Sequence, residues 1–179
     1  YIHNLEPFWA HYQGNWRLDF NQKHAGDVYA THGLGPVCQV LDIHRGDKME
    51  YLVSMSTPSY NGKKIAEEMM GTEDFANGDM TSTLIKTNKG KTILIQHNVY
   101  TPRPYDRLYQ LTGTEGFANK YPYQGFTLKE ENVPSDVIPD HEKLDEHGFV
   151  SNEVRDSLLV AYKHPIAKDI EEKAKSVGG

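Results

Sequence analysis

The chain has 179 residues, of which 37% are hydrophobic and 25% are charged, a composition typical of an ordinary globular domain. Its formal net charge of -6 argues against a nucleic-acid partner, because proteins that bind phosphate backbones present a basic surface. No apolar run approaches the roughly 20 residues that a membrane helix needs, and the single cysteine, Cys38, excludes an internal disulfide and a cysteine-based zinc site.

The first part of the chain predicts alternating extended and helical segments. In chain order these are a strand at residues 1–5, a polar loop or insertion at 11–26, a helix at 32–44, a strand at 51–57 and a helix at 63–70. We expect Pro36 in the first turn of its helix, where a missing amide is tolerated, and Gly46 to stop that helix. The His44-Arg45 pair suits a helix C-terminus without any ligand.

The clearest local signal in the second part is a β-hairpin. Residues 80–87 and 91–100 are β-rich runs on either side of Asn88-Lys89-Gly90. The remaining segments are strands at 107–112 and 116–121, an exposed acidic loop at 134–148, and helices at 154–162 and 166–177. Antiparallel strands in a row between helices predict an α+β fold, an open and mainly antiparallel β-sheet with helices packed on one face. We expect residues 1–179 to form a single domain.

The chain has no fingerprint for binding a dinucleotide. Gly33-Leu34-Gly35-Pro36 is the nearest approach to a Gly-x-Gly-x-x-Gly turn, but it lacks the third glycine and a preceding apolar strand. Pro36 also removes an amide that a phosphate would bind. We therefore expect no cofactor-binding residues in this part of the protein.

Tyr29 and His32 form a candidate pair at the start of a predicted helix. The positive end of the helix dipole disfavours the imidazolium form of a histidine at this position. A neutral imidazole beside a tyrosine hydroxyl can accept and donate protons near neutral pH. Thr31 or His32 serving only as a helix cap is the alternative, and the spacing leaves both interpretations open.

A second candidate segment is Thr101-Pro102-Arg103-Pro104-Tyr105. The two prolines stiffen the chain and would present Arg103 and Tyr105 in a fixed orientation that suits the hydroxyl or amide groups of a ligand. The alternative is a rigid edge connection with Arg103 in a local ion pair. His141 and His147 lie in the acidic loop, but no cluster has metal-ligand spacing, so we predict no metal site.

Several strings resemble one known family, in order along almost the whole chain. They are YATHGLGP at 29–36, HRGD at 44–47, YLVSMS at 51–56, TLIKT at 83–87, TPRPY at 101–105, GTEG at 113–116 and KHPI at 163–166. Together they resemble glycoside hydrolase family 109, in the Gfo/Idh/MocA oxidoreductase superfamily, whose known members include α-N-acetylgalactosaminidases. The resemblance implies an N-terminal Rossmann domain that holds NAD, followed by this domain on the substrate side, so the chain is expected to be part of a larger two-domain protein.

The resemblance also implies a reaction by oxidation, elimination, hydration and reduction. Bound NAD would oxidise the sugar C3 hydroxyl, a base would remove the acidified C2 proton, and the C1 leaving group would depart before water and hydride return. Tyr29 and His32 match the family's Tyr-x-x-His catalytic positions. Tyr105 matches a further active-site tyrosine, Tyr1 stands where the family has another, and Arg103 is expected beside them on the substrate.

Two alternatives to this NAD-dependent glycosidase remain open. One is a sugar dehydrogenase or oxidoreductase of the same superfamily without glycosidase activity, and the other is a non-catalytic carbohydrate-binding or dimerisation module. In every case we expect a carbohydrate partner, no nucleic acid and no membrane span, with the open sheet face available to join two copies. Export from a bacterial cytoplasm fits the resemblance. The isolated chain is expected neither to bind NAD nor to hydrolyse glycosides.

Overall fold

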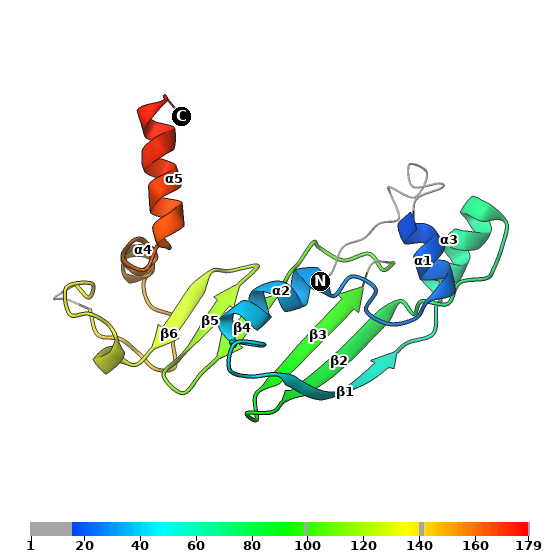
Figure 1. Ribbon diagram of the computed structural model, residues 1–179, viewed down its shortest axis with the longest axis horizontal. Helices are drawn as coiled ribbons and strands as arrows, with labels where there is room; N and C mark the ends of the chain where they lie inside the picture. Colours follow the sequence, from blue (N-terminus) through cyan, green and yellow to red (C-terminus); the bar gives the residue numbers. More distant parts are fainter. Residues whose placement is uncertain (1–15, 99, 140–141, 179) are drawn as a thin grey trace. The chain divides into compact units, whose positions relative to one another are not determined.

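The computed structural model describes residues 16–98, 100–139 and 142–178 (Figure 1). Five α-helices and two open, three-stranded antiparallel sheets lie within these residues. The predicted α+β class with open antiparallel strands is therefore confirmed. In the same residues no helix is long and apolar enough to cross a membrane.

The contacts within the chain divide it into two compact units, Tyr1–Arg107 and Leu108–Gly179. The first unit contains α1 (Trp16–Lys23), α2 (Thr31–Val40), β1 (Met49–Ser56), α3 (Asn61–Met70), β2 (Met80–Thr87) and β3 (Thr92–Asn98). The second contains β4 (Tyr109–Thr112), β5 (Gly116–Lys120), β6 (Gly125–Leu128), a 3-10 helix (Glu130–Asn132), α4 (Asn152–Ala161) and α5 (Pro165–Ser176). The single domain expected over residues 1–179 stays a prediction.

The first sheet has the strand order β1-β2-β3, and its β2-β3 hairpin is the one that the sequence predicts. Helix α2 covers one face of this sheet (Figure 1). Its apolar side chains recur at helical spacing and pack on a buried isoleucine cluster of β2 and β3; the residues in contact are Leu34, Val37 and Leu41 on α2 with Ile85, Ile93 and Ile95 on the sheet. Each fully buried isoleucine contributes roughly 1.5–3 kcal/mol to stability.

The described residues of the first unit leave the other side of this sheet uncovered. Register pairs Val53 with Leu84 and Leu84 with Leu94, so these residues share one face. More than half of each side chain on this open sheet face is exposed, for Tyr51, Val53, Met55, Leu84 and Leu94. On this face an apolar row of Val53, Leu84 and Leu94 crosses all three strands.

Helix α1 corrects the prediction of a polar loop at residues 11–26, as far as the described residues reach. Its apolar pattern is weak, but Asp19 and Lys23 form an ion pair one turn apart at 2.7 Å. Asn21 on α1 is buried, and its Oδ1 accepts hydrogen bonds from Asn77 Nδ2 at 2.7 Å and from the Tyr100 hydroxyl. Polar tertiary contacts hold this helix, so hydrophobic periodicity does not reveal it.

Helix α3 lies beside α1 (Figure 1) and is anchored by a single carboxylate. Asp79 Oδ2 accepts hydrogen bonds from the Tyr60 and Asn61 amides at 3.2 and 2.9 Å, and Oδ1 accepts one from the Gly62 amide at 3.1 Å. These are amides at the helix start that would otherwise lack intrahelical partners. A side chain at Gly62 would place Cβ only 2.4 Å from Ser59 Oγ, so the turn into this helix requires glycine.

The second unit builds its own small core. Strands β4, β5 and β6 form the second sheet, in which β6 is a strand that the sequence did not predict. The buried cluster consists of Val133, Val150, Val154 and Leu158, with Phe126, Leu128, Val137, Ile138 and Leu144 packed against it. Three of these packed residues come from the segment predicted as an exposed loop, which is therefore irregular in backbone but partly anchored by its apolar side chains.

Candidate active site

Tyr29 and His32 meet at the start of α2. Tyr29 lies in the turn before the helix, and His32 is the second helical residue. Their ring centroids are 4.6 Å apart with an interplanar angle of 35°, and both residues are half-buried. The structure thus brings together the two residues that the sequence singles out as catalytic. Their catalytic roles stay predictions.

The N-cap of α2 is Ala30, not Thr31 or His32. Its backbone is helical, with φ -59 and ψ -26, and no side-chain hydrogen bond caps it. The interpretation of Thr31 or His32 as a simple helix cap is therefore wrong. The His32 side chain therefore does not cap the helix.

The segment that carries Tyr29 is held in place from two directions. Asn77, which is 0% exposed, accepts a hydrogen bond from the Gly26 amide through Oδ1 at 3.1 Å. In the next residue, Asp27, the carboxylate Oδ1 accepts a hydrogen bond from the Tyr29 amide at 3.1 Å. Sequence reasoning missed Asn77, which is distant in sequence from Gly26, and Asp27, whose carboxylate forms a local turn with the amide two residues later.

The residues nearest to a nucleotide-binding pattern lie in the interior of α2. Gly33, Gly35 and Pro36 all lie inside the helix, so these glycines do not form a phosphate-binding turn. Pro36 lies in the second turn of α2, which corrects the expectation of the first turn; its missing amide would have paired with the carbonyl of His32. A Cβ on Gly33 would lie 3.5 Å from Ile95 Cγ2, so the helix start rests closely on β3.

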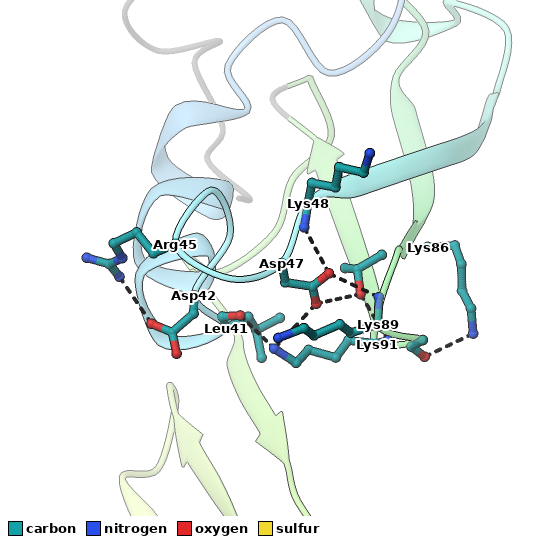
Figure 2. A network of polar contacts seen from close by, with 10 residues as sticks. Leu41, Asp42, Arg45, Asp47, Lys48, Lys86, Lys89 and Lys91 are labelled. Atoms are coloured by element: carbon teal, nitrogen blue, oxygen red, sulfur yellow. Dashed lines mark hydrogen bonds and ion pairs between the residues drawn. The ribbon is translucent and has the colours of Figure 1, made fainter.

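The other end of α2 is closed by Asp47, a buried carboxylate (Figure 2). Its Oδ1 accepts hydrogen bonds from the Lys48 and Lys89 amides at 2.8 and 3.1 Å. Its Oδ2 accepts one from the Thr87 hydroxyl at 2.8 Å and lies 3.4 Å from Lys91 Nζ. Lys91 Nζ also donates to the Leu41 carbonyl at 2.7 Å, which ties the end of the helix to the hairpin.

This network accounts for the protonation of Asp47. Burial raises the pKa of the carboxyl group, but hydrogen bonds from Thr87, Lys48, Lys89 and Lys91 lower it, to about 2. Asp47 is therefore ionised at neutral pH with every oxygen satisfied. Such a carboxylate has a structural role.

The helix itself ends earlier than the sequence predicts, at Val40 rather than at residue 44. Asp42 and His44 have positive φ angles of 57° and 64°, a conformation that ends a helix and that side chains other than glycine seldom adopt. Arg45 Nη donates to the Gln39 carbonyl at 2.8 Å, in the last turn of the helix. The arginine thus satisfies a terminal carbonyl, as expected.

The remaining predicted site residues lie elsewhere or outside the described residues. Tyr105 and Arg103 are exposed near the end of the first unit. Arg107 donates from Nε to the Tyr105 hydroxyl, and its guanidinium carbon lies 5.6 Å from the centroid of that ring. Tyr1 falls outside the described residues. The substrate-binding roles of Tyr1, Arg103 and Tyr105 stay predictions.

The described part of the chain contains no group of three or more His, Cys, Asp or Glu side chains that could hold a metal ion. Cys38 is a free, half-buried thiol on α2, and burial raises its pKa. A raised pKa keeps the thiol protonated and unreactive.

Comparison with known proteins defines the class of this chain. The family model described as the C-terminal domain of glycosyl hydrolase 109 matches residues 9–179. The chain therefore belongs to glycosyl hydrolase family 109, which confirms the resemblance drawn from its motifs. That family is by its name a family of glycosyl hydrolases.

Three relatives illustrate this similarity. The chain is 59% identical over 181 residues to Glycosyl hydrolase family 109 protein 1 of Bacteroides fragilis (strain YCH46) and to a Glycosyl hydrolase family 109 protein of Porphyromonas gingivalis; each alignment covers 100% of this chain and 39% of the relative. It is 44% identical over 190 residues to family 109 protein 3 of Phocaeicola vulgatus, covering 99% of this chain and 34% of the relative. The chain thus spans about two-fifths of the length of the curated relatives it matches.

Proposed function

We propose that this chain forms the substrate side of an NAD-dependent glycosidase that acts on α-N-acetylgalactosaminides. Membership of glycosyl hydrolase family 109 supports the glycosidase class. The observation that carries the proposal is the contact between the Tyr29 and His32 rings at 4.6 Å, on a half-buried helix start. The wider Gfo/Idh/MocA relationship is part of the same proposal.

In the proposed reaction, side chains of this chain transfer protons. NAD, when bound, supplies a hydride acceptor whose action on the sugar acidifies the proton on the neighbouring carbon. The His32 imidazole accepts that proton, since a histidine is suited to proton transfer near neutral pH. The Tyr29 hydroxyl binds and orients the sugar hydroxyl beside it. Such a route needs no opposed pair of carboxylates.

The proposal places no dinucleotide site on this chain. The glycines nearest to a phosphate-binding pattern, Gly33 and Gly35, are internal to α2, where their amides take part in the helix. We therefore assign NAD to the remainder of the full-length protein, because this chain covers only 39% of a typical relative. This chain binds the sugar opposite the cofactor, with Tyr1, Arg103 and Tyr105 as further substrate contacts.

A glycosidase assay on the full-length protein tests this proposal. Incubation with an aryl α-N-acetylgalactosaminide should release the aryl group without added NAD, because the cofactor is retained and regenerated in each turnover. Net production of NADH without aryl release would instead identify a sugar oxidoreductase. The absence of both aryl release and NADH production would favour a non-catalytic module. Calorimetry on the isolated chain should detect no binding of NAD.

We also propose that the open sheet face joins two copies of the protein. Of the β2 and β3 residues on this face, Lys86 alone is charged, so two copies can pair there without the repulsion expected from a net charge of -6. Light scattering on the full-length protein should give the mass of a dimer. Leu84→Lys with Leu94→Lys should yield monomers, because two buried charges would face their own copies; an unchanged mass would exclude this face.

A further inference from the structure

Two buried polar atoms near the candidate active site have no hydrogen-bond partner. They are Nδ1 of His97 and Oδ2 of Asp27. His97 is only 1% exposed. Unpartnered polar atoms at such depth are rare in native proteins, and they commonly mark a functional group or an ordered water.

His97 lies beneath the start of α2. It is the next residue after Ile95 on the covered face of β3, and Ile95 is the residue on which Gly33 rests. Asp27 belongs to the segment that leads into the same helix, where its other oxygen, Oδ1, accepts a hydrogen bond from the Tyr29 amide. Both unpartnered atoms are therefore close to the segment that carries Tyr29 and His32.

The electrostatics of His97 connect it to Asp27. Burial lowers the pKa of His97, and the negative charge of Asp27 opposes this shift. The two side chains are thus within electrostatic reach of each other. A neutral imidazole with its proton on Nδ1 has a donor for the carboxylate, and a carboxylate with one unoccupied oxygen has an acceptor for the imidazole.

We propose that His97 and Asp27 form a positioning pair behind the Tyr29–His32 site, with one water bridging His97 Nδ1 and Asp27 Oδ2. The bridge orients the carboxylate, the carboxylate holds the Tyr29 amide, and Tyr29 in turn holds its ring against His32. His97 contacts neither substrate nor cofactor in this arrangement. The effect of this pair on catalysis rests on the proposed function. The contact between His97 and Asp27 does not.

Two substitutions in the full-length protein separate this role from a packing role. His97→Asn keeps a polar atom near the position of Nδ1, whereas His97→Gln keeps one near Nε2. We expect His97→Asn to retain kcat within about threefold and His97→Gln to lose about 30-fold in kcat with KM little changed, as for a group that acts on the transition state. Equal losses in the two variants would overturn the proposal.

Thr81→Val is the matched control for stability. Thr81 faces His97 across the β2-β3 ladder and is 0% exposed, but it has no link to Asp27 in the proposed pair. The Thr81→Val substitution should lower Tm without changing kcat. A kcat that falls with Tm across Thr81→Val, His97→Asn and His97→Gln alike would show that His97 matters only for packing, and would overturn the proposal.

A crystal structure of the full-length protein tests the bridge independently of activity. A water should lie within about 3.2 Å of both His97 Nδ1 and Asp27 Oδ2. An Nδ1 atom that faces only apolar side chains would reject the pair. If the wild-type protein lacks glycosidase activity, the proposed function fails, and the crystal structure alone then decides whether the pair exists.

Discussion

The two ends of helix α2 differ in how their polar groups are satisfied. At the C-terminal end, Asp47 receives hydrogen bonds or an ion pair on both carboxylate oxygens, and Lys91 joins it to the Leu41 carbonyl (Figure 2). At the N-terminal end no side chain caps the helix, and Asp27 and His97 each leave one buried atom unpartnered.

If the proposed function holds, this difference separates a stabilising site from a functional one on a single helix. A satisfied buried network stabilises and rigidifies its surroundings, whereas unsatisfied polar groups cost stability and persist where they serve a function. Substitutions at the Asp47 end should therefore change stability. Those at the Tyr29–His32 end should change activity.

The largest effect is expected at His32. His32→Ala in the full-length protein should lower kcat by about two to four orders of magnitude, the usual range for a lost acid–base group. Turnover of an aryl α-N-acetylgalactosaminide measures it. His24→Ala is the control, because His24 is exposed just after α1 and stacks on Phe20 at 4.0 Å. Near-normal turnover in His32→Ala would remove this residue from the mechanism.

The second expected effect is on stability. Asp47→Ala should lower Tm by roughly 5–10 °C, because two amides and the Thr87 hydroxyl lose their acceptor in a buried turn. Thermal unfolding followed by circular dichroism measures it. Asp42→Asn is the matched control: Asp42 is exposed and its contact with Arg45 spans 3.6 Å, so Tm should hardly change. Equal losses in both variants would contradict the comparison.

The third prediction concerns pH. The folded-state pKa of Asp47 is about 2, below its ordinary value of 3.8, so ionised Asp47 stabilises the folded protein fully above pH 3.8. This stabilisation should be lost as pH falls from 3.8 towards 2, as the carboxylate takes up a proton. Denaturant unfolding over this range should show a steep loss in the wild type. Asp47→Asn should show a shallower loss, and parallel curves would refute the assignment.

Hydrophobic periodicity predicted the elements whose anchors are apolar. Helix α2, for example, is recognisable from Leu34, Val37 and Leu41, which pack on the sheet. Helix α1 was missed because its anchor is the polar contact of Asn21 with Asn77 and Tyr100, residues distant in sequence. The predicted end of α2 was wrong because Asp42 has a left-handed backbone, which cannot be predicted from an aspartate in the sequence.

The candidate site divides in a similar way. Tyr29 and His32 are close in sequence, and their family pattern pointed to them before their geometry was known. His97, Asp27 and Asn77 come from separate segments, and the fold brings them to the chain around Tyr29: Asn77 binds the Gly26 amide, Asp27 binds the Tyr29 amide, and the charge of Asp27 acts on His97. No local pattern links them, so the residues that hold the site in place emerge only from the fold.

The smallest effect is expected from adding a cap to α2. Ala30→Ser should change Tm by less than about 1 °C, because the Ala30 backbone is helical and a capping side chain needs an extended backbone to reach the first amides. Ser151→Ala on α4 is the contrast: Ser151 Oγ accepts from the Val154 amide at 3.2 Å and donates to Glu142 at 2.7 Å. Its loss should lower Tm by roughly 2–5 °C. A clear rise in Tm for Ala30→Ser would mean that ordinary capping does stabilise the N-terminal end of α2. The two ends of the helix would then differ only in how far their polar groups are satisfied.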